Sequence, residues 1–208
     1  MNYEKTELYF LKRELMREFG ETEGEKLFTR SSKLYAELVV TTDYQGSIAL
    51  EAQLKRLTYP IIAYYKALRA FGYKMEYSLL LVKKVTERAA RECAEVLSAQ
   101  NRKFFAFHAF RRNFKKFCES KFPAAGWSRE PAQKEKEKIS LRIDRCLYHT
   151  ITKKFGCPEL CGVFCRYEEI AFAGLYPKVV YSGQGFIANG HDFCDFTFSK
   201  GEKKNLKG

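Results

Sequence analysis

The chain has 208 residues and a mass of 24.3 kDa, enough for one domain or for one domain with a sizeable appendage. Hydrophobic residues make up 46% of the sequence and aromatic residues 15%, which excludes a disordered protein. Charged residues make up 30% and no apolar run approaches the ~18 residues of a membrane span, which excludes a transmembrane protein. Residues 1–20 alternate charged with apolar side chains, so we expect no signal peptide and a cytoplasmic protein.

The first 126 residues carry apolar side chains at helical spacing and predict a helical portion. Gly20 should end the first helix, and Pro60 should kink or divide the third. Phe122–Gly126 should end the fifth. The predicted helices contain Leu8–Phe19, Thr22–Val40, Leu54–Leu68, Met75–Leu97 and Phe104–Phe117.

The pattern changes after Gly126. Residues 127–138 are polar and lack a periodic apolar face, so we interpret them as a mobile linker. Residues 139–200 predict an α+β portion, and residues 201–208 predict a disordered tail. Within the α+β portion the expected order is a strand at Ile139–Ile143, helices at His149–Phe155 and Glu159–Ala173, a strand at Lys178–Ala188, a hairpin turn at Asn189–Asp192 and a return strand at Phe193–Ser199. The fold class is therefore α+β: a helical N-terminal portion followed by a small antiparallel sheet with packed helices.

The formal net charge is +12, and seven basic residues lie between Arg102 and Lys121, interleaved with aromatic residues. This composition occurs on nucleic-acid-binding surfaces. A simpler interpretation is that the phenylalanines form the buried face of a helix and leave the basic residues in solvent. A basic patch of this kind also attracts small anionic substrates. No nucleic-acid-binding module accompanies the segment, so we do not expect nucleic acid as a partner.

The sequence holds seven cysteines, which in a reducing compartment are free thiols, metal ligands or catalytic groups. If one helix includes Cys157, Cys161 and Cys165, their spacing of four residues places them on one stripe of that helix. Glu168, three residues after Cys165, lies on the same stripe. The alternative is that these are small buried thiols beside a solvated carboxylate. Zinc sites more often use C-x₂-C pairs, so we expect no metal.

A second group of candidate residues surrounds the predicted hairpin: His191, Asp192, Cys194 and Asp195. Ordinary turn chemistry accounts equally well for His191 and Asp192. Cys194 alternates with Phe196 and Phe198, which also fits packing in the core. The chain has no P-loop, dinucleotide-binding, HExxH or G-x-S-x-G motif, so no cofactor is expected.

The run RCLYHTITKKFGCPELCGVFCRYEE, followed by VVYSGQGFIANGHDFCDFTF, resembles the L-2-amino-thiazoline-4-carboxylic acid hydrolase family. Glu168 stands where that family usually has Asp. The substitution keeps the negative charge but places it at the end of a longer side chain. The C-terminal part is also similar to vinyl-reductase-type small-molecule-binding domains, which end in a cysteine-bearing hairpin. The residues that carry the resemblance are Cys146, Cys165 with Glu168, Gly190, Asp192, Cys194, Asp195 and Phe196.

The resemblance implies a cofactor-independent hydrolase that opens a thiazoline or a similar cyclic amidine, giving an N-carbamoyl cysteine from the thiazoline. On this basis Glu168 binds the amidinium, Cys165 or Cys194 is the nucleophile or the acid, and His191 or Asp192 lies near the attacking water. Cys161 and Asp195 are the expected substrate-binding residues. Burial next to apolar groups is expected to raise the pKa of Glu168.

Two further functions stay open at this stage. One is a non-catalytic small-molecule-binding or sensory domain that uses the pocket where we expect Cys165, Glu168 and Cys194 to meet. The other is a nucleic-acid-binding protein that uses the segment from Arg102 to Lys121. We expect a small-molecule substrate as the partner, and neither nucleic acid nor a membrane. The pattern predicts no oligomeric state.

Overall fold

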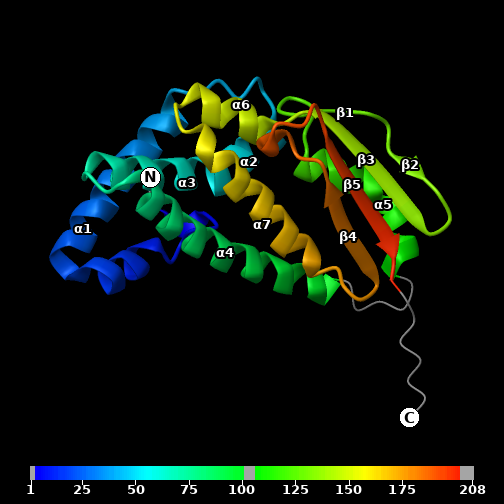
Figure 1. The fold of residues 1–208 in the computed structure, drawn as a ribbon, viewed down its shortest axis with the longest axis horizontal. Coiled ribbons are helices and arrows are strands. Elements are labelled where there is room, and N and C mark those ends of the chain that lie inside the picture. Colours follow the sequence, from blue (N-terminus) through cyan, green and yellow to red (C-terminus); the bar gives the residue numbers. More distant parts are fainter. Residues whose placement is uncertain (1–2, 101–105, 202–208) are drawn as a thin grey trace, which may run out of the picture. The chain divides into compact units, whose positions relative to one another are not determined.

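The computed structural model describes residues 3–100 and 106–201 (Figure 1). A mostly helical N-terminal region precedes a five-stranded antiparallel sheet with helices, which confirms the α+β class. Two compact units divide the chain, one of Met1–Ala89 with Ile151–Val163, the other of Ala90–Thr150 with Phe164–Gly208. This division differs from the predicted one at residues 127–138, because each unit takes segments from two parts of the chain.

The helical elements alternate with strands only in the last third of the chain (Figure 1). The main helices are α1 (Leu11–Val40), α2 (Ile48–Gln53), α3 (Tyr59–Ala70), α4 (Met75–Gln100), α5 (Ala106–Lys121), α6 (Leu147–Lys154) and α7 (Cys161–Ala173). The strands are β1 (Ser128–Arg129), β2 (Gln133–Lys134), β3 (Lys138–Arg145), β4 (Val179–Gln184) and β5 (Cys194–Lys200).

In the first unit, glycine and proline interrupt the helices where the sequence predicts. Gly20 has φ 78° and ψ 167°, a conformation that glycine adopts without strain, and it breaks α1 into two helical segments. Pro60 lies in the first turn of α3, directly after a π-helical turn at Leu54–Thr58. The core of this unit is built from buried leucine, isoleucine and tyrosine side chains of α1 and α3.

In the second unit, the sheet order is β1-β3-β5-β4, with β2 also paired to β3. Ile139, Leu141 and Ile143 are buried on β3, as their alternation predicts. Their cross-strand partners on β5 are Phe198, Phe196 and Cys194, respectively. This register places the Cys194 side chain on the inner face of the sheet.

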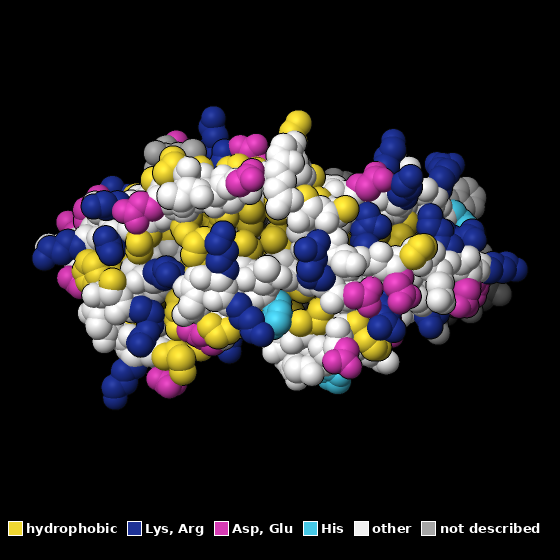
Figure 2. Space-filling model, turned by 90° about the horizontal axis from the view of Figure 1, so that it is seen from above, with side chains coloured by type: hydrophobic (Ala, Val, Ile, Leu, Met, Phe, Trp, Pro, Cys, Tyr) yellow, Lys and Arg dark blue, Asp and Glu magenta, His cyan; other side chains and the backbone are white. Residues whose placement is uncertain are grey.

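The phenylalanines of α5 pack against this inner face. The ring centroids of Phe110, Phe114 and Phe117 lie 5.3, 5.4 and 5.8 Å from that of Phe198. Arg112 and Lys115 are exposed on the opposite side of α5, so the segment is an amphipathic helix with a solvated basic face. Figure 2 shows Lys and Arg side chains dispersed over one face of the molecule, with Asp and Glu between them. Phe104, Arg102 and Lys103 lie outside the described residues.

Residues 127–138 differ from the predicted linker because they contain regular structure. Trp127 is buried, and β1 and β2 both pair with β3. These strands form without an alternating apolar pattern because each has only two residues, and those residues are exposed or partly exposed. At the other end of the chain, Gly201 donates its N–H to the Lys178 carbonyl at 3.0 Å, so the ordered part extends into the predicted tail.

The C-terminal hairpin is present, but its connection is longer than predicted. β4 ends at Gln184, not at Ala188, and a 3₁₀ turn at Ile187–Asn189 follows. Gly190 ends that turn with φ 88°. None of the helices in the described part of the chain combines the length and apolar composition that a membrane span requires.

Candidate functional site

A small cavity lies on the inner face of the sheet in the second unit. The side chains that line it are Phe122, Trp127, Ile143, Cys146, Tyr148, Cys165, Glu168, Phe186, Cys194 and Phe196. About 20 Å³ of it is open to the centre of a water-sized sphere, which is room for roughly one water molecule. The cavity therefore joins three thiols and a carboxylate inside an aromatic shell.

Local structure explains why these groups meet. Cys165 and Glu168 are three residues apart on α7, so they lie on one face of the helix. Cys194 points inward because β5 alternates Cys194, Phe196 and Phe198 on the buried face. Cys146 comes directly after β3, between that strand and α6.

Glu168 is the central polar group of the cavity. It is 3% exposed, and its Oε1 accepts a hydrogen bond from the Tyr148 hydroxyl at 2.9 Å. Its Oε2 is buried and has no hydrogen-bond partner among the described residues. Burial raises the pKa of the Glu168 carboxyl, while the charge of Lys121 and the Tyr148 hydrogen bond oppose that rise. A buried oxygen without a partner is available to a ligand or a water molecule.

Tyr148 is held rigidly between aromatic rings. It stacks on Phe164 with centroids 4.6 Å apart and an interplanar angle of 9°, and Trp127 meets it edge-on at 5.4 Å. Burial and the neighbouring Glu168 charge raise the pKa of Tyr148 well above its usual value. Tyr148 is therefore a neutral donor, and its contacts fix the position of Glu168.

The thiols of the cavity differ in environment. Burial raises the pKa of Cys194 to about 12, although the Ile187 backbone N–H donates to its Sγ at 3.3 Å. Cys146 is also buried, whereas Cys165 is partly exposed. A thiol with so high a pKa stays protonated at neutral pH, so Cys194 does not attack as a thiolate in the ligand-free protein.

Two of the three cysteines predicted to share one stripe with Glu168 do not reach the cavity. Cys157 precedes a 3₁₀ turn at Pro158–Leu160 and lies outside α7. Cys161 begins α7 and is buried, but it does not line the cavity. Pro158 explains the difference, because it starts a separate turn before the α-helix. Only Cys165 and Glu168 of the predicted stripe reach the cavity.

The hairpin residues also separate. His191 and Asp192 are exposed in the connection between β4 and β5, and they do not line the cavity. Asp195 points to the outer face of the sheet, because neighbouring residues of a strand face opposite sides. Of the four hairpin candidates, Cys194 alone lines this cavity.

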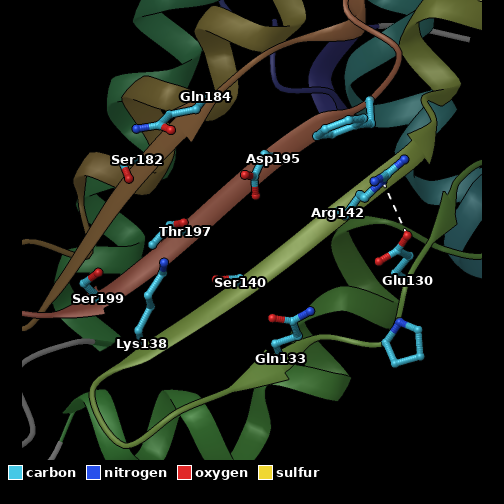
Figure 3. Close-up of a pocket in the computed structure, with 12 residues that line it drawn as sticks. Glu130, Gln133, Lys138, Ser140, Arg142, Ser182, Gln184, Asp195, Thr197 and Ser199 are labelled. Atoms are coloured by element: carbon cyan, nitrogen blue, oxygen red, sulfur yellow. Dashed lines mark ion pairs between the residues drawn. The ribbon is translucent and has the colours of Figure 1, made fainter.

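Asp195 contributes instead to an open polar groove of about 600 Å³ on the outer face of the sheet (Figure 3). Strands β3, β5 and β4 supply most of its side chains, which are predominantly hydroxyl, amide and charged groups. Arg142 approaches Glu130 at 3.4 Å and Asp144 at 2.8 Å. This is the composition of the solvated face of an antiparallel sheet, so the groove is the weaker candidate.

Sequence reasoning missed Tyr148 and Phe186. Tyr148 reaches Glu168 only because α6 and α7 bring residues 20 positions apart into contact, and no short motif links the two. Among the described residues, no group of three His, Cys, Asp or Glu is placed to hold a metal ion.

The comparisons with known proteins agree with the motif. The profile of the L-2-amino-thiazoline-4-carboxylic acid hydrolase family matches residues 51–198. No curated protein matches the chain. The solved structures that match include an H-NOX protein from S. oneidensis, at 9% identity and a TM-score of 0.39, and one from K. algicida, at 7% and 0.37. Both alignments cover 100% of each chain, and scores this low support no statement about ligand or activity.

Proposed function

This chain belongs to the L-2-amino-thiazoline-4-carboxylic acid hydrolase family, and we propose that it is a cofactor-independent hydrolase of a small cyclic amidine or thiazoline. The active site of this proposal is the cavity around Glu168. The observation that carries it is the buried Glu168 carboxylate, whose Oε2 lacks a partner among the described residues, beside the thiols of Cys165 and Cys194.

Glu168 is proposed to bind the substrate amidinium. A buried carboxylate is costly unless it is paired, and a cationic N–H group on Oε2 supplies that pair. Tyr148 already occupies Oε1, so the ligand meets a carboxylate with one free oxygen in a fixed position. Binding of the cation favours the ionised carboxyl and offsets the rise in pKa that burial causes.

Cys165 is the proposed nucleophile and Cys194 the proposed acid. The partly exposed Cys165 thiol gives its proton to solvent as its sulfur forms a bond to the amidine carbon; the ring carbon–sulfur bond then breaks, and the ring sulfur takes the proton of the Cys194 thiol. Water then attacks the same carbon, releasing an N-carbamoyl cysteine and free Cys165 and returning a proton to Cys194. This order uses the partly exposed thiol for attack and the buried thiol, which keeps its proton at neutral pH, for protonation of the ring sulfur.

The proposal gives no chemical step to the remaining predicted residues. His191 and Asp192 are exposed, Asp195 faces the outer groove, and Cys161 does not line the cavity. We therefore assign the activation of water to a group of the cavity, the Cys194 thiolate that remains after the first step.

The test is turnover of L-2-amino-thiazoline-4-carboxylate by the purified protein, followed by the release of the product thiol. Glu168→Gln should lower kcat/KM at least ~100-fold, because it removes the charge that holds the cation. Glu169→Gln is the matched control, since Glu169 pairs with Arg166 at 3.1 Å and does not line the cavity; it should retain activity. Full activity in Glu168→Gln would remove Glu168 from the mechanism. Binding without turnover by the wild-type protein would favour the non-catalytic small-molecule-binding function.

A further inference from the structure

Tyr181 on β4 carries a second buried polar atom without a partner. Its hydroxyl is buried and makes no hydrogen bond to any of the described residues. Leaving a buried hydroxyl unsatisfied costs about 1–3 kcal/mol, and such groups are rare in folded proteins unless water or a ligand satisfies them. This tyrosine is outside the set of residues that sequence motifs or the proposed mechanism use.

Tyr181 does not itself line the cavity, but it lies next to two residues that do. The Tyr181 ring contacts Phe196, a lining residue, with centroids 5.7 Å apart. A Cβ atom at Gly183 would stand 2.5 Å from Cζ of Phe186 and 3.0 Å from the Tyr181 hydroxyl oxygen. The ring of the lining residue Phe186 and the Tyr181 hydroxyl therefore both border the space next to Gly183.

The electrostatic surroundings of Tyr181 agree with this position. Burial raises the pKa of Tyr181, and the nearby carboxylates of Glu168 and Glu169 raise it further. Of these two groups, Glu168 lines the cavity. The phenol is therefore neutral and keeps its proton to donate.

Phe186 belongs to the connection between β4 and β5, directly before the 3₁₀ turn at Ile187–Asn189. The cavity has room for roughly one water molecule, so a ligand of thiazoline size must displace a lining side chain. Phe186 is only partly buried and contacts Phe196 at 6.0 Å between ring centroids. Gly185, directly before it, has φ 65°, a conformation that favours glycine.

We propose that Tyr181 is a further ligand-binding residue of this site: the ligand displaces the Phe186 ring and accepts a hydrogen bond from the Tyr181 hydroxyl while its cationic N–H binds Oε2 of Glu168. This inference rests on the proposed function, and it narrows the ligand to a small molecule with a cationic N–H donor on one side and an acceptor, such as a carboxylate oxygen, on the other. Gly183 is required because a side chain there would occupy the space between Phe186 and Tyr181.

The experiment compares Tyr181→Phe with the wild-type protein in three measurements: turnover of L-2-amino-thiazoline-4-carboxylate, calorimetric binding of the same compound, and thermal unfolding. The variant should raise KM and Kd about 10-fold or more, the effect of losing one hydrogen bond to a charged acceptor. Its melting temperature should stay the same or rise, because the hydroxyl has no hydrogen-bond partner among the residues that the structure describes. Tyr176→Phe is the control, since Tyr176 is 62% exposed and should change none of the three quantities.

The outcomes separate the two proposals. If the wild-type protein turns the compound over and Tyr181→Phe leaves KM, kcat and Kd unchanged, the Tyr181 inference is wrong and the proposed function stands. A lower melting temperature with unchanged KM and Kd would show a structural role and would also overturn the inference. If the wild-type protein binds the compound without turning it over, the proposed function fails, and the ratio of the two Kd values still decides the inference. If it does neither, both proposals fall.

Phe186→Ala gives a second, independent variant. Removing the ring opens the space that the ligand is proposed to fill, so ligand binding no longer has to displace it. In this background, Tyr181→Phe should still weaken binding by the same factor. An effect of Tyr181→Phe that disappears in the Phe186→Ala background would show that the hydroxyl acts through the Phe186 ring and not on the ligand.

Discussion

Glu168 and Tyr148 form a buried, hydrogen-bonded pair. The Tyr148 hydroxyl satisfies one carboxylate oxygen of Glu168 and leaves the other without a partner in the described part of the chain. A half-satisfied buried carboxylate is unfavourable for stability. Such groups gather at functional sites, where binding or catalysis uses the perturbed pKa.

The raised pKa of Glu168 predicts a pH-dependent difference in stability between the wild-type protein and Glu168→Gln. A raised folded-state pKa means that the folded protein binds the proton more tightly than the unfolded chain. The stability that protonated Glu168 contributes is therefore fully present below the ordinary carboxyl pKa of 4.5. It is lost as pH rises through the raised pKa of the folded protein. Thermal unfolding should show Glu168→Gln gaining stability over the wild-type protein as pH increases from 4.5. Parallel curves for the two proteins would contradict this, with Glu169→Gln as the control.

Tyr148→Phe should destabilise the protein by about 1–3 kcal/mol, because it leaves a buried carboxylate oxygen without its donor. Since the Tyr148 hydrogen bond lowers the pKa of Glu168, its loss should also move the acid limb of the kcat/KM profile to higher pH. Denaturant unfolding and a pH–rate profile measure the two effects. An unchanged unfolding free energy would show that the Tyr148 hydrogen bond contributes nothing to stability. Tyr181→Phe is the comparison, because the Tyr181 hydroxyl has no hydrogen-bond partner in the described part of the chain.

At the scale of elements, strand alternation and helical spacing sort the candidate residues. Cys194 and Asp195 are adjacent in sequence, yet they face opposite sides of the sheet and line different hollows. Cys165 and Glu168 stay together because both lie on α7. Spacing is therefore informative only inside one continuous element, which is why Cys157, before the turn at Pro158, leaves the group.

The segment of residues 127–138 should still be where limited proteolysis begins, but with a defined boundary. Lys136 is exposed in the turn between β2 and β3, so trypsin should cut there first. Arg129 should resist, because it pairs with β3 and its Nε donates to the Phe122 carbonyl at 3.3 Å. Mass spectrometry of the first fragments locates the cuts. Early cleavage at Arg129 would show that β1 opens readily, and cuts elsewhere in the chain would show that this segment is well anchored.

At the scale of the whole molecule, the size of the chain governs what it needs in order to fold. A chain of 208 residues buries about 70% of its unfolded surface, so burial alone stabilises it. Each of the two units takes residues from separate parts of the chain. Neither half of the sequence therefore corresponds to one compact unit.

We expect folding to be independent of metal. The cysteine spacing differs from the common zinc pairs, and the described residues hold no cluster suited to a metal ion. A chelator should leave the melting temperature unchanged, and elemental analysis should find no stoichiometric zinc or iron. Loss of the fold together with one bound metal ion per chain would overturn this expectation.

The sequence by itself determined the fold class, most helix and strand positions, and the family, because these follow from local periodicity, glycine and proline positions and a continuous motif. It also determined that Cys165 and Glu168 share a face, since one helix carries both. Only the tertiary structure decided which groups surround Glu168. Tyr148, Phe186 and Tyr181 come from other elements, and His191 and Asp192 stay outside although they lie close to Cys194 in sequence. The physical reason is that cavities form between elements, where packing and strand register, rather than spacing along the chain, determine which side chains meet.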